Sequence, residues 1–174
     1  MKPCTVVATS AVLMAVATAG HAQVTRLEIA SRAPVGGGPS GRAGAYENIR
    51  GRIYGEVDPV DRRNRIIQDL DLAARNQRGK IEYVATFSLM KPVDNAKASG
   101  VLTYFVVNRG NGGASPGTDG HISLVSGWQG DVTPTAINQT IRVPVARNRD
   151  GSPVTGPVLA RFADVPAGTN TMPI

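Results

Sequence analysis

The chain has 174 residues, of which 41% are hydrophobic and 18% charged, and its formal net charge is +6 at neutral pH. This is an ordinary size for one domain, with enough apolar residues for a core. The positive charge comes from arginines spread along the chain, and only 5% of the residues are aromatic. Modules that bind nucleic acid carry clustered cations, so the composition argues against that class of partner.

The first segment, residues 1–22, has the three parts of a cleavable secretory signal. Lys2 supplies the positive start, residues 6–19 are uncharged and mostly apolar, and Gly20-His21-Ala22 places small side chains before the expected cleavage site. The apolar run is shorter than the roughly 20 residues that a membrane-spanning helix needs. We therefore expect an exported protein, periplasmic or secreted, without a stable membrane anchor and with residues 23–174 as its mature part.

Removal of this signal limits the available chemistry. It takes away the only cysteine, Cys4, and one of the two histidines, so that His121 is the single histidine left. The mature chain then has neither a disulfide nor a thiol nucleophile. A zinc site would need carboxylate ligands, and none cluster at metal-ligand spacing. We expect no metal and no cofactor.

Alternation of apolar and polar residues, which is typical of strands, dominates the first half of the mature chain. Residues 24–31 alternate weakly, residues 49–57 place isoleucines and glycines on one face, and residues 81–89 alternate clearly. The glycines within residues 49–57 predict a bulge or close packing. Residues 64–74 fit either a helix or a strand, and the lack of a good helix cap favours a strand.

Two later segments, residues 101–107 and 122–125, are apolar on both faces. Such strands lie in the middle of a sheet that other layers cover, as in α/β proteins. No long amphipathic helix is visible in the mature sequence. We therefore expect the covering layer to come from another chain or from sequence beyond residue 174.

Two more strands are expected: residues 137–145 alternate, and residues 158–162 offer a last short strand. Together these segments predict an α/β or mixed, β-rich fold with about seven to eight strands and few helices. Residues 23–174 are expected to form one unit.

Two loops are the best candidates for a functional site, because each directly follows an apolar strand and α/β folds bind ligands at the carboxyl ends of their strands. The first loop is rich in glycine and offers backbone N–H groups to an anion or oxyanion. The second holds the only tryptophan, which is either part of a site or a packed plug. The candidate residues are Asn108, Arg109, Gly110 and Asn111 in the first loop, and Gly127, Trp128, Gln129 and Asp131 in the second.

Two other features invite a catalytic interpretation and do not support one. Residues 113–117 match the nucleophile-elbow pattern G-x-S-x-G, but no helix pattern follows Ser115, and the chemistry of the elbow requires a turn between a strand and a helix. His121 begins a short strand, where a half-exposed histidine is ordinary. We assign no catalytic residue.

The sequence resembles the amino-terminal part of bacterial alpha/beta-hydrolase-domain proteins of poorly defined function. The resemblance runs from VTRLEIASRAPVGGG through AYENIRGRIYGEVDPVDRRN to the most specific segments, VVNRGN and SGWQGD. It implies an exported enzyme of the serine esterase type. In this family residues 108–111 would occupy the oxyanion loop, although the stretch between VVNRGN and SGWQGD is shorter here than usual, which leaves that role open.

The resemblance also implies that the nucleophile, acid and histidine come later in the family than any position of this chain. The expected function is thus an amino-terminal portion of an incomplete α/β-hydrolase-like domain, inactive by itself, whose full-length form would act on a small ester-type substrate. The alternative is a stand-alone exported β-sandwich that binds a ligand or partner without catalysis. The sequence does not indicate an oligomeric state.

Overall fold

The structure is a computed structural model that describes residues 22–35, 42–110, 112–117, 119–133, 135, 137–157 and 167–168. The predicted signal lies outside the described residues, except for Ala22. The strand expected at residues 158–162 lies outside them as well.

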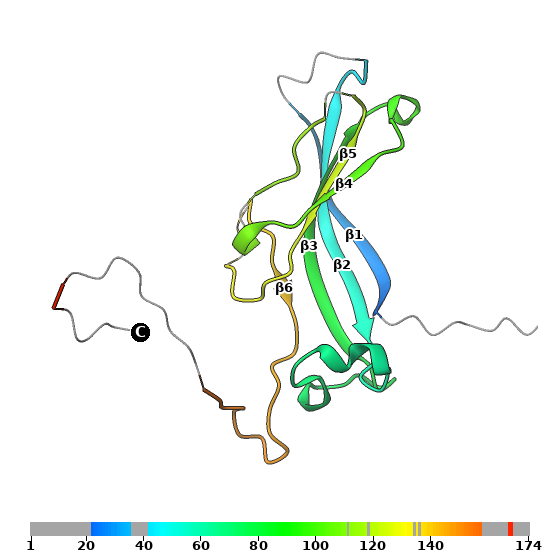
Figure 1. Cartoon of the computed structure of the whole chain (residues 1–174). Helices are drawn as coiled ribbons and strands as arrows, with labels where there is room; N and C mark the ends of the chain where they lie inside the picture. Colours follow the sequence, from blue (N-terminus) through cyan, green and yellow to red (C-terminus); the bar gives the residue numbers. More distant parts are fainter. Residues whose placement is uncertain are drawn as a thin grey trace, which may run out of the picture.

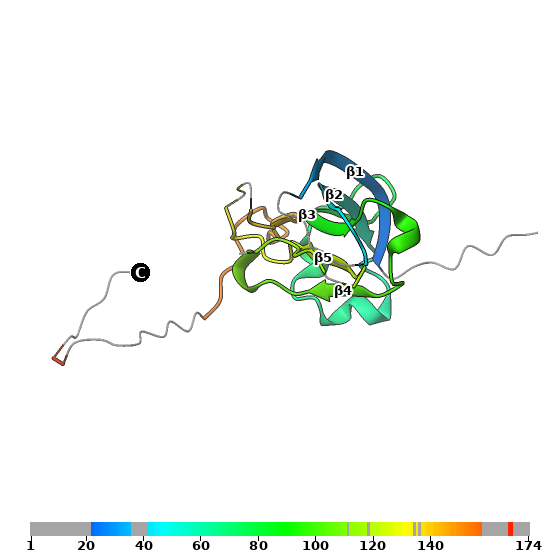
Figure 2. The same cartoon turned by 90° about the horizontal axis from the view of Figure 1, so that it is seen from above.

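The strands of the described part of the chain form a single sheet of six (Figure 1). Its order is β1-β2-β3-β5-β4, which Figure 2 shows from above, and β6 pairs with β3 beyond β5. The strands are β1 (Ala22–Pro34), β2 (Tyr46–Val57), β3 (Ile81–Pro92), β4 (Leu102–Phe105), β5 (Ile122–Ser126) and β6 (Ile141–Arg142). The expectation of a β-rich fold with few helices is confirmed.

The helices are short 3-10 turns: η1 (Arg62–Ile66), η2 (Leu70–Leu72), η3 (Asn95–Lys97) and η4 (Asn108–Gly110). None of the described helices has the length and apolar character needed to cross a membrane.

The strands predicted at residues 49–57 and 81–89 are the centre of the sheet. They lie within β2 and β3, which pair antiparallel from Tyr46 opposite Pro92 to Val57 opposite Ile81 without a register shift. Their predicted apolar faces hold most of the core residues of this pair. The period of two in the sequence therefore describes this part of the fold correctly.

The glycines of β2 lie where neighbouring groups leave no room for a side chain. A Cβ on Gly51 would lie 1.9 Å from the carbonyl oxygen of Glu28 in β1, beside a register shift of the β1–β2 pair between Ile29 and Ser31. A Cβ on Gly55 would lie 2.3 Å from the ring of Tyr83. The predicted bulge and close packing are both present.

The strand expected at residues 64–74 is wrong, because this segment forms η1 and η2. Local polar contacts hold the turns: the Asp61 carboxylate caps the Arg63 N–H at 2.9 Å, and the Asn64 side chain donates to the Asp58 carbonyl at 2.8 Å. Side-chain bonds to nearby backbone groups compete with sheet ladders. The pattern of apolar residues in this segment gives no sign of these polar contacts.

The prediction that residues 101–107 are buried on both faces is also wrong for the described structure. The strand is shorter than expected, and β4 is the last strand of the sheet, so that all four of its residues are exposed. Exposed apolar side chains continue on both sides of it, and the set is Val101, Leu102, Tyr104, Phe105 and Val106. Of residues 137–145, only Ile141 and Arg142 form a strand.

The loop that follows β2 contains an ion pair that makes stability depend on pH. The Lys80 ammonium, and then the Val60 N–H, donate to the Asp58 carboxylate and hold its pKa below the usual range. A lowered folded-state pKa favours folding above the unfolded-state pKa of about 3.9, and this contribution disappears as the pH falls through the folded-state pKa.

We therefore expect Asp58→Asn to be less stable than the original chain at pH 7, and the difference to shrink as the pH falls below the unfolded-state pKa of about 3.9. Urea unfolding at a series of pH values measures it. Asp71→Asn, a change at an exposed aspartate, is the control. A difference between Asp58→Asn and the original chain that stayed constant down to pH 3 would contradict the role of the Asp58–Lys80 pair.

Candidate functional site

The two predicted loops lie together at one end of a parallel strand pair. β4 and β5 pair in parallel from Leu102 opposite Ile122 to Phe105 opposite Val125. Because parallel strands end at the same edge of a sheet, η4 after β4 and the loop after β5 are neighbours (Figure 1). This is the position at which α/β sheets bind ligands.

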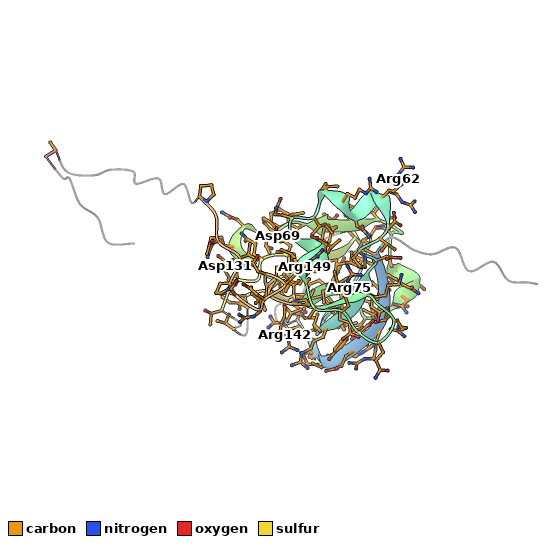
Figure 3. The ribbon with its side chains drawn as sticks, turned by 90° about the horizontal axis from the view of Figure 1, so that it is seen from below. Arg62, Asp69, Arg75, Asp131, Arg142 and Arg149 are labelled. Atoms are coloured by element: carbon orange, nitrogen blue, oxygen red, sulfur yellow. The ribbon has the colours of Figure 1, made fainter. Side chains whose placement is uncertain are left out.

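Two side-chain contacts tie the loops to each other. The Arg109 guanidinium forms an ion pair with the Asp131 carboxylate at 2.7 Å, and the Trp128 indole N–H donates to the Val107 carbonyl at 2.6 Å. The ion pair is about 60% exposed on both sides, and Figure 3 shows Asp131 at the periphery of the molecule. Such pairs contribute about 0–1 kcal/mol, so this one positions the loops more than it stabilises them.

The backbone of the first loop is strained at Arg109, with φ 48° and ψ 40° inside η4. A left-handed residue between helical ones turns successive N–H groups toward one side, which is the geometry of an anion-binding concavity. A non-glycine residue in this region costs about 1–3 kcal/mol, and such strain clusters at functional sites. The conformation is thus compatible with the anion role predicted for residues 108–110, and Asn111 lies outside the described residues.

The second loop starts at a position that only glycine can occupy. A Cβ on Gly127 would lie 2.1 Å from the carbonyl oxygen of Thr140. The Gly127 N–H donates to the Thr86 carbonyl, and the Thr86 N–H donates to the Thr140 carbonyl, both at 2.9 Å. The two ends of the loop, Gly127 and Thr140, therefore close against the same residue of β3.

Gln129 lies half-buried inside this loop. Its carbonyl accepts hydrogen bonds from the Thr140 hydroxyl at 3.2 Å and from the Ile141 N–H at 3.3 Å. Its side-chain oxygen Oε1 is buried and has no hydrogen-bond partner among the described residues. A buried acceptor without a donor is costly, and a hydroxyl or amide of a bound molecule could satisfy it.

A small apolar cluster lies where the two loops begin. It consists of Val107, Val125 and Ala114, which are at most 6% exposed, with Met90 packed against them. Trp128 is not part of this core, because 51% of it is exposed. Its N–H is bound and its ring is half open, so the indole both anchors the loop and offers a surface for contact.

Ser115 and His121 lie outside this arrangement. His121 directly precedes β5, at the strand end opposite to the loops, and its carbonyl accepts a hydrogen bond from the Tyr46 hydroxyl at 3.2 Å. Ser115 is exposed in an irregular segment between η4 and β5. Within the described residues no hydrogen bond joins a serine to His121, and no helix follows the G-x-S-x-G pattern.

Sequence reasoning missed Thr140 and the Val107 carbonyl, because both act through backbone atoms or across long separations that no residue type signals. It also missed the gathering of arginines that are far apart in the sequence. Arg75, Arg147 and Arg149 line one surface hollow, and Figure 3 shows Arg75 beside Arg149.

Comparison with known proteins does not assign a function to these loops. No protein-family model matches the chain, and no curated protein or solved structure matches it significantly. A functional assignment therefore depends on the geometry of the two loops and of the sheet that carries them. The backbone N–H groups around Arg109 and the side chain of Gln129 can bind a small polar or anionic molecule.

Proposed function

We propose that this chain is the amino-terminal portion of an exported α/β-hydrolase-like protein of the serine esterase type, and that it is inactive by itself. The observation that supports this most directly is the parallel β4–β5 pair, with both candidate loops at its carboxyl end. The export rests on the signal pattern of residues 1–22.

The exposure of β4 supports the incomplete character of the unit. Parallel strands are normally covered on both faces by helices, whereas β4 is at the end of the sheet with apolar side chains exposed. Contiguous exposed apolar surface marks a place where another part of a protein packs. In the proposed protein, a further strand and its helices would cover this surface.

The loops would then contribute binding and charge stabilisation rather than a nucleophile. The left-handed turn at Arg109 would present N–H groups to the oxyanion that forms when an ester is attacked. The segment that covers β4 would supply the serine, the histidine and the acid. The substrate class is a small ester, which the neutral tryptophan face and the Gln129 side chain could contact.

The purified chain should not hydrolyse short-chain p-nitrophenyl esters above the buffer rate. The reason is that, among the residues that the structure describes, neither Ser115 nor His121 has a partner of the kind that activates a serine. The absorbance of the released p-nitrophenolate measures it. Turnover that Ser115→Ala or His121→Ala abolished would overturn the proposal.

The second candidate is a stand-alone exported binding module without catalysis. The observation that favours it is an apolar pocket of about 330 Å³. This pocket lies where β3 begins, at Ile81, and β6 pairs with β3 between Ile81 and the residues of β3 that contact the second loop. The described strands form one sheet, so the second sheet of the expected sandwich is not among the described residues.

Binding of a hydrophobic dye separates the two candidates. An incomplete unit should bind the dye strongly through β4, and Phe105→Asp should reduce the binding. Val60→Asp, at a side chain that is 75% exposed outside this surface, is the matched control and should change nothing. A cooperative thermal transition, together with dye binding that Phe105→Asp leaves unchanged, would favour the stand-alone module.

A further inference from the structure

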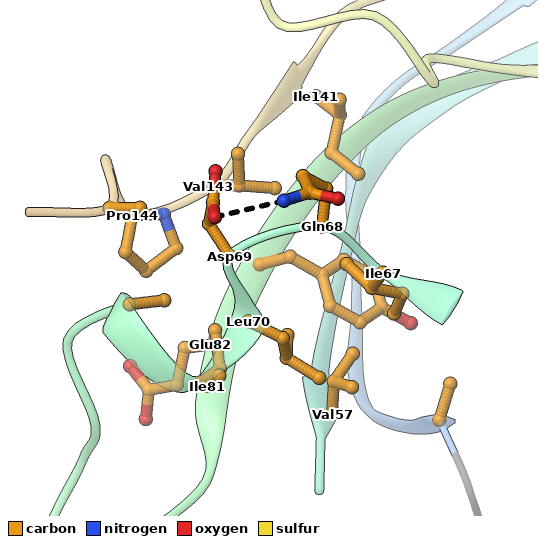
Figure 4. Close-up of a pocket in the computed structure, with 14 residues that line it drawn as sticks. Val57, Ile67, Gln68, Asp69, Leu70, Ile81, Glu82, Ile141, Val143 and Pro144 are labelled. Atoms are coloured by element: carbon orange, nitrogen blue, oxygen red, sulfur yellow. Dashed lines mark hydrogen bonds between the residues drawn. The ribbon is translucent and has the colours of Figure 1, made fainter. Parts of the chain in front are cut away.

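The apolar pocket has three walls from segments far apart in the sequence. The end of the sheet contributes Val57, Ile81 and Ile141. The segment after η1 contributes Ile67, the start of η2 contributes Leu70, and Val143 follows β6 (Figure 4). The ring of Tyr83, which lies over Gly55, also lines it. Its volume of about 330 Å³ is within the range of pockets for small ligands.

The charged groups of the pocket all have the same sign. Asp69 and Glu82 are the only charged residues among the 14 that line it. The Asp69 carboxylate accepts a hydrogen bond from the neighbouring Gln68 amide at 3.1 Å, and the Glu82 carboxylate accepts one from Asn76 at 2.8 Å. Neither carboxylate has a cationic partner among the described residues.

Asp69 is also held in an unusual backbone conformation, with φ 53° and ψ 23°. This left-handed turn lies directly before η2, and Figure 4 shows the carboxylate beside Val143 and Pro144. The Gln68 amide satisfies part of this half-buried carboxylate but leaves its charge unpaired among aliphatic side chains, which is unfavourable. A ligand cation at this position would neutralise it.

We propose that this pocket binds a small amphiphile with an alkyl body and an ammonium head. The alkyl chain packs against the aliphatic walls, and the ammonium lies beside the Asp69 carboxylate, with Glu82 adding negative potential. This site is separate from the two loops and does not depend on the proposed esterase-type function.

Three ligands with the same alkyl chain test the proposal: octylammonium, octanol and octanoate. Titration of the full chain, followed by the NMR signals of the Ile67, Leu70 and Ile81 methyl groups, measures the three affinities. We expect octylammonium to bind at least about fivefold more tightly than octanol, and octanoate to bind most weakly. Equal affinity for octylammonium and octanoate would overturn the proposal without any variant.

Asp69→Asn removes the charge and keeps a residue that tolerates the left-handed conformation. It should lower the affinity for octylammonium toward that of octanol, with Glu82 retaining a small part of the preference, and leave octanol unchanged. Asp71→Asn, an equal charge change at an exposed residue that does not line the pocket, is the matched control. Leu70→Phe, which fills the pocket, should weaken all three ligands. An unchanged preference for octylammonium in Asp69→Asn would overturn the proposal.

Discussion

Replacement of Tyr46 by alanine is expected to lower the free energy of unfolding by about 4 kcal/mol. Tyr46 is fully buried at the start of β2, opposite Pro92 of β3. Its hydroxyl donates to the His121 carbonyl at 3.2 Å, which ties the edge of the β2–β3 pair to the beginning of β5. Truncation leaves a cavity and also removes this link.

Urea unfolding of the full chain measures the effect, and Tyr46→Phe separates its two causes. The phenylalanine keeps the ring and removes only the hydroxyl, so it should cost about 1 kcal/mol. Tyr104→Ala, which removes a half-exposed ring from β4, should cost about 1 kcal/mol or less because little packing is lost. A cost for Tyr46→Ala no larger than that for Tyr104→Ala would show that Tyr46 is not a core residue.

The second large effect is expected at Gly127, where alanine should cost about 3 kcal/mol or more through overpacking. The new Cβ would lie 2.1 Å from the Thr140 oxygen and 2.2 Å from its carbonyl carbon. These are backbone atoms, which a side-chain rotation cannot move away. The bonds of Thr86 to both Gly127 and Thr140 would therefore lengthen or break.

Thermal unfolding should show a decrease in Tm of roughly 10 °C for Gly127→Ala. Gly113→Ala is the matched control, because a Cβ at Gly113 would have no atom within 4 Å. The fluorescence of Trp128 provides a second readout, since its hydrogen bond to Val107 depends on the loop that Gly127 begins. Equal Tm values for the two variants would contradict the close approach of Thr140.

The proposed esterase-type role and the apolar pocket use different parts of one sheet. The two ends of the loop after β5 close against Thr86 of β3, whereas the pocket lies where β3 begins, around Ile81 and Tyr83. Thr140 and Ile141 connect the two, because Thr140 closes the second loop and Ile141 lines the pocket. None of the described candidate residues of the two loops lines the pocket, so loss of one function should leave the other measurable.

The central strands were determined by the sequence itself. Alternation in residues 49–57 and 81–89 is a local property, and it sets which face of β2 and β3 is buried wherever the strands pair. The apolar runs that became β4 and β5 likewise showed where two loops would follow strands. A period of two depends only on near neighbours, so it can be read without knowing the fold.

Only the tertiary structure determines which strands of the sheet are covered and which loops lie next to each other. The apolar pattern of residues 101–107 indicated burial, yet β4 is the last strand of the sheet, since strand order depends on pairing between distant segments. Polar contacts of Asp61 and Asn64 stabilise turns in a segment, residues 64–74, whose apolar residues also fitted a strand. The Arg109–Asp131 pair joins residues on loops after two different strands, and only the parallel pairing of those strands brings them within 2.7 Å.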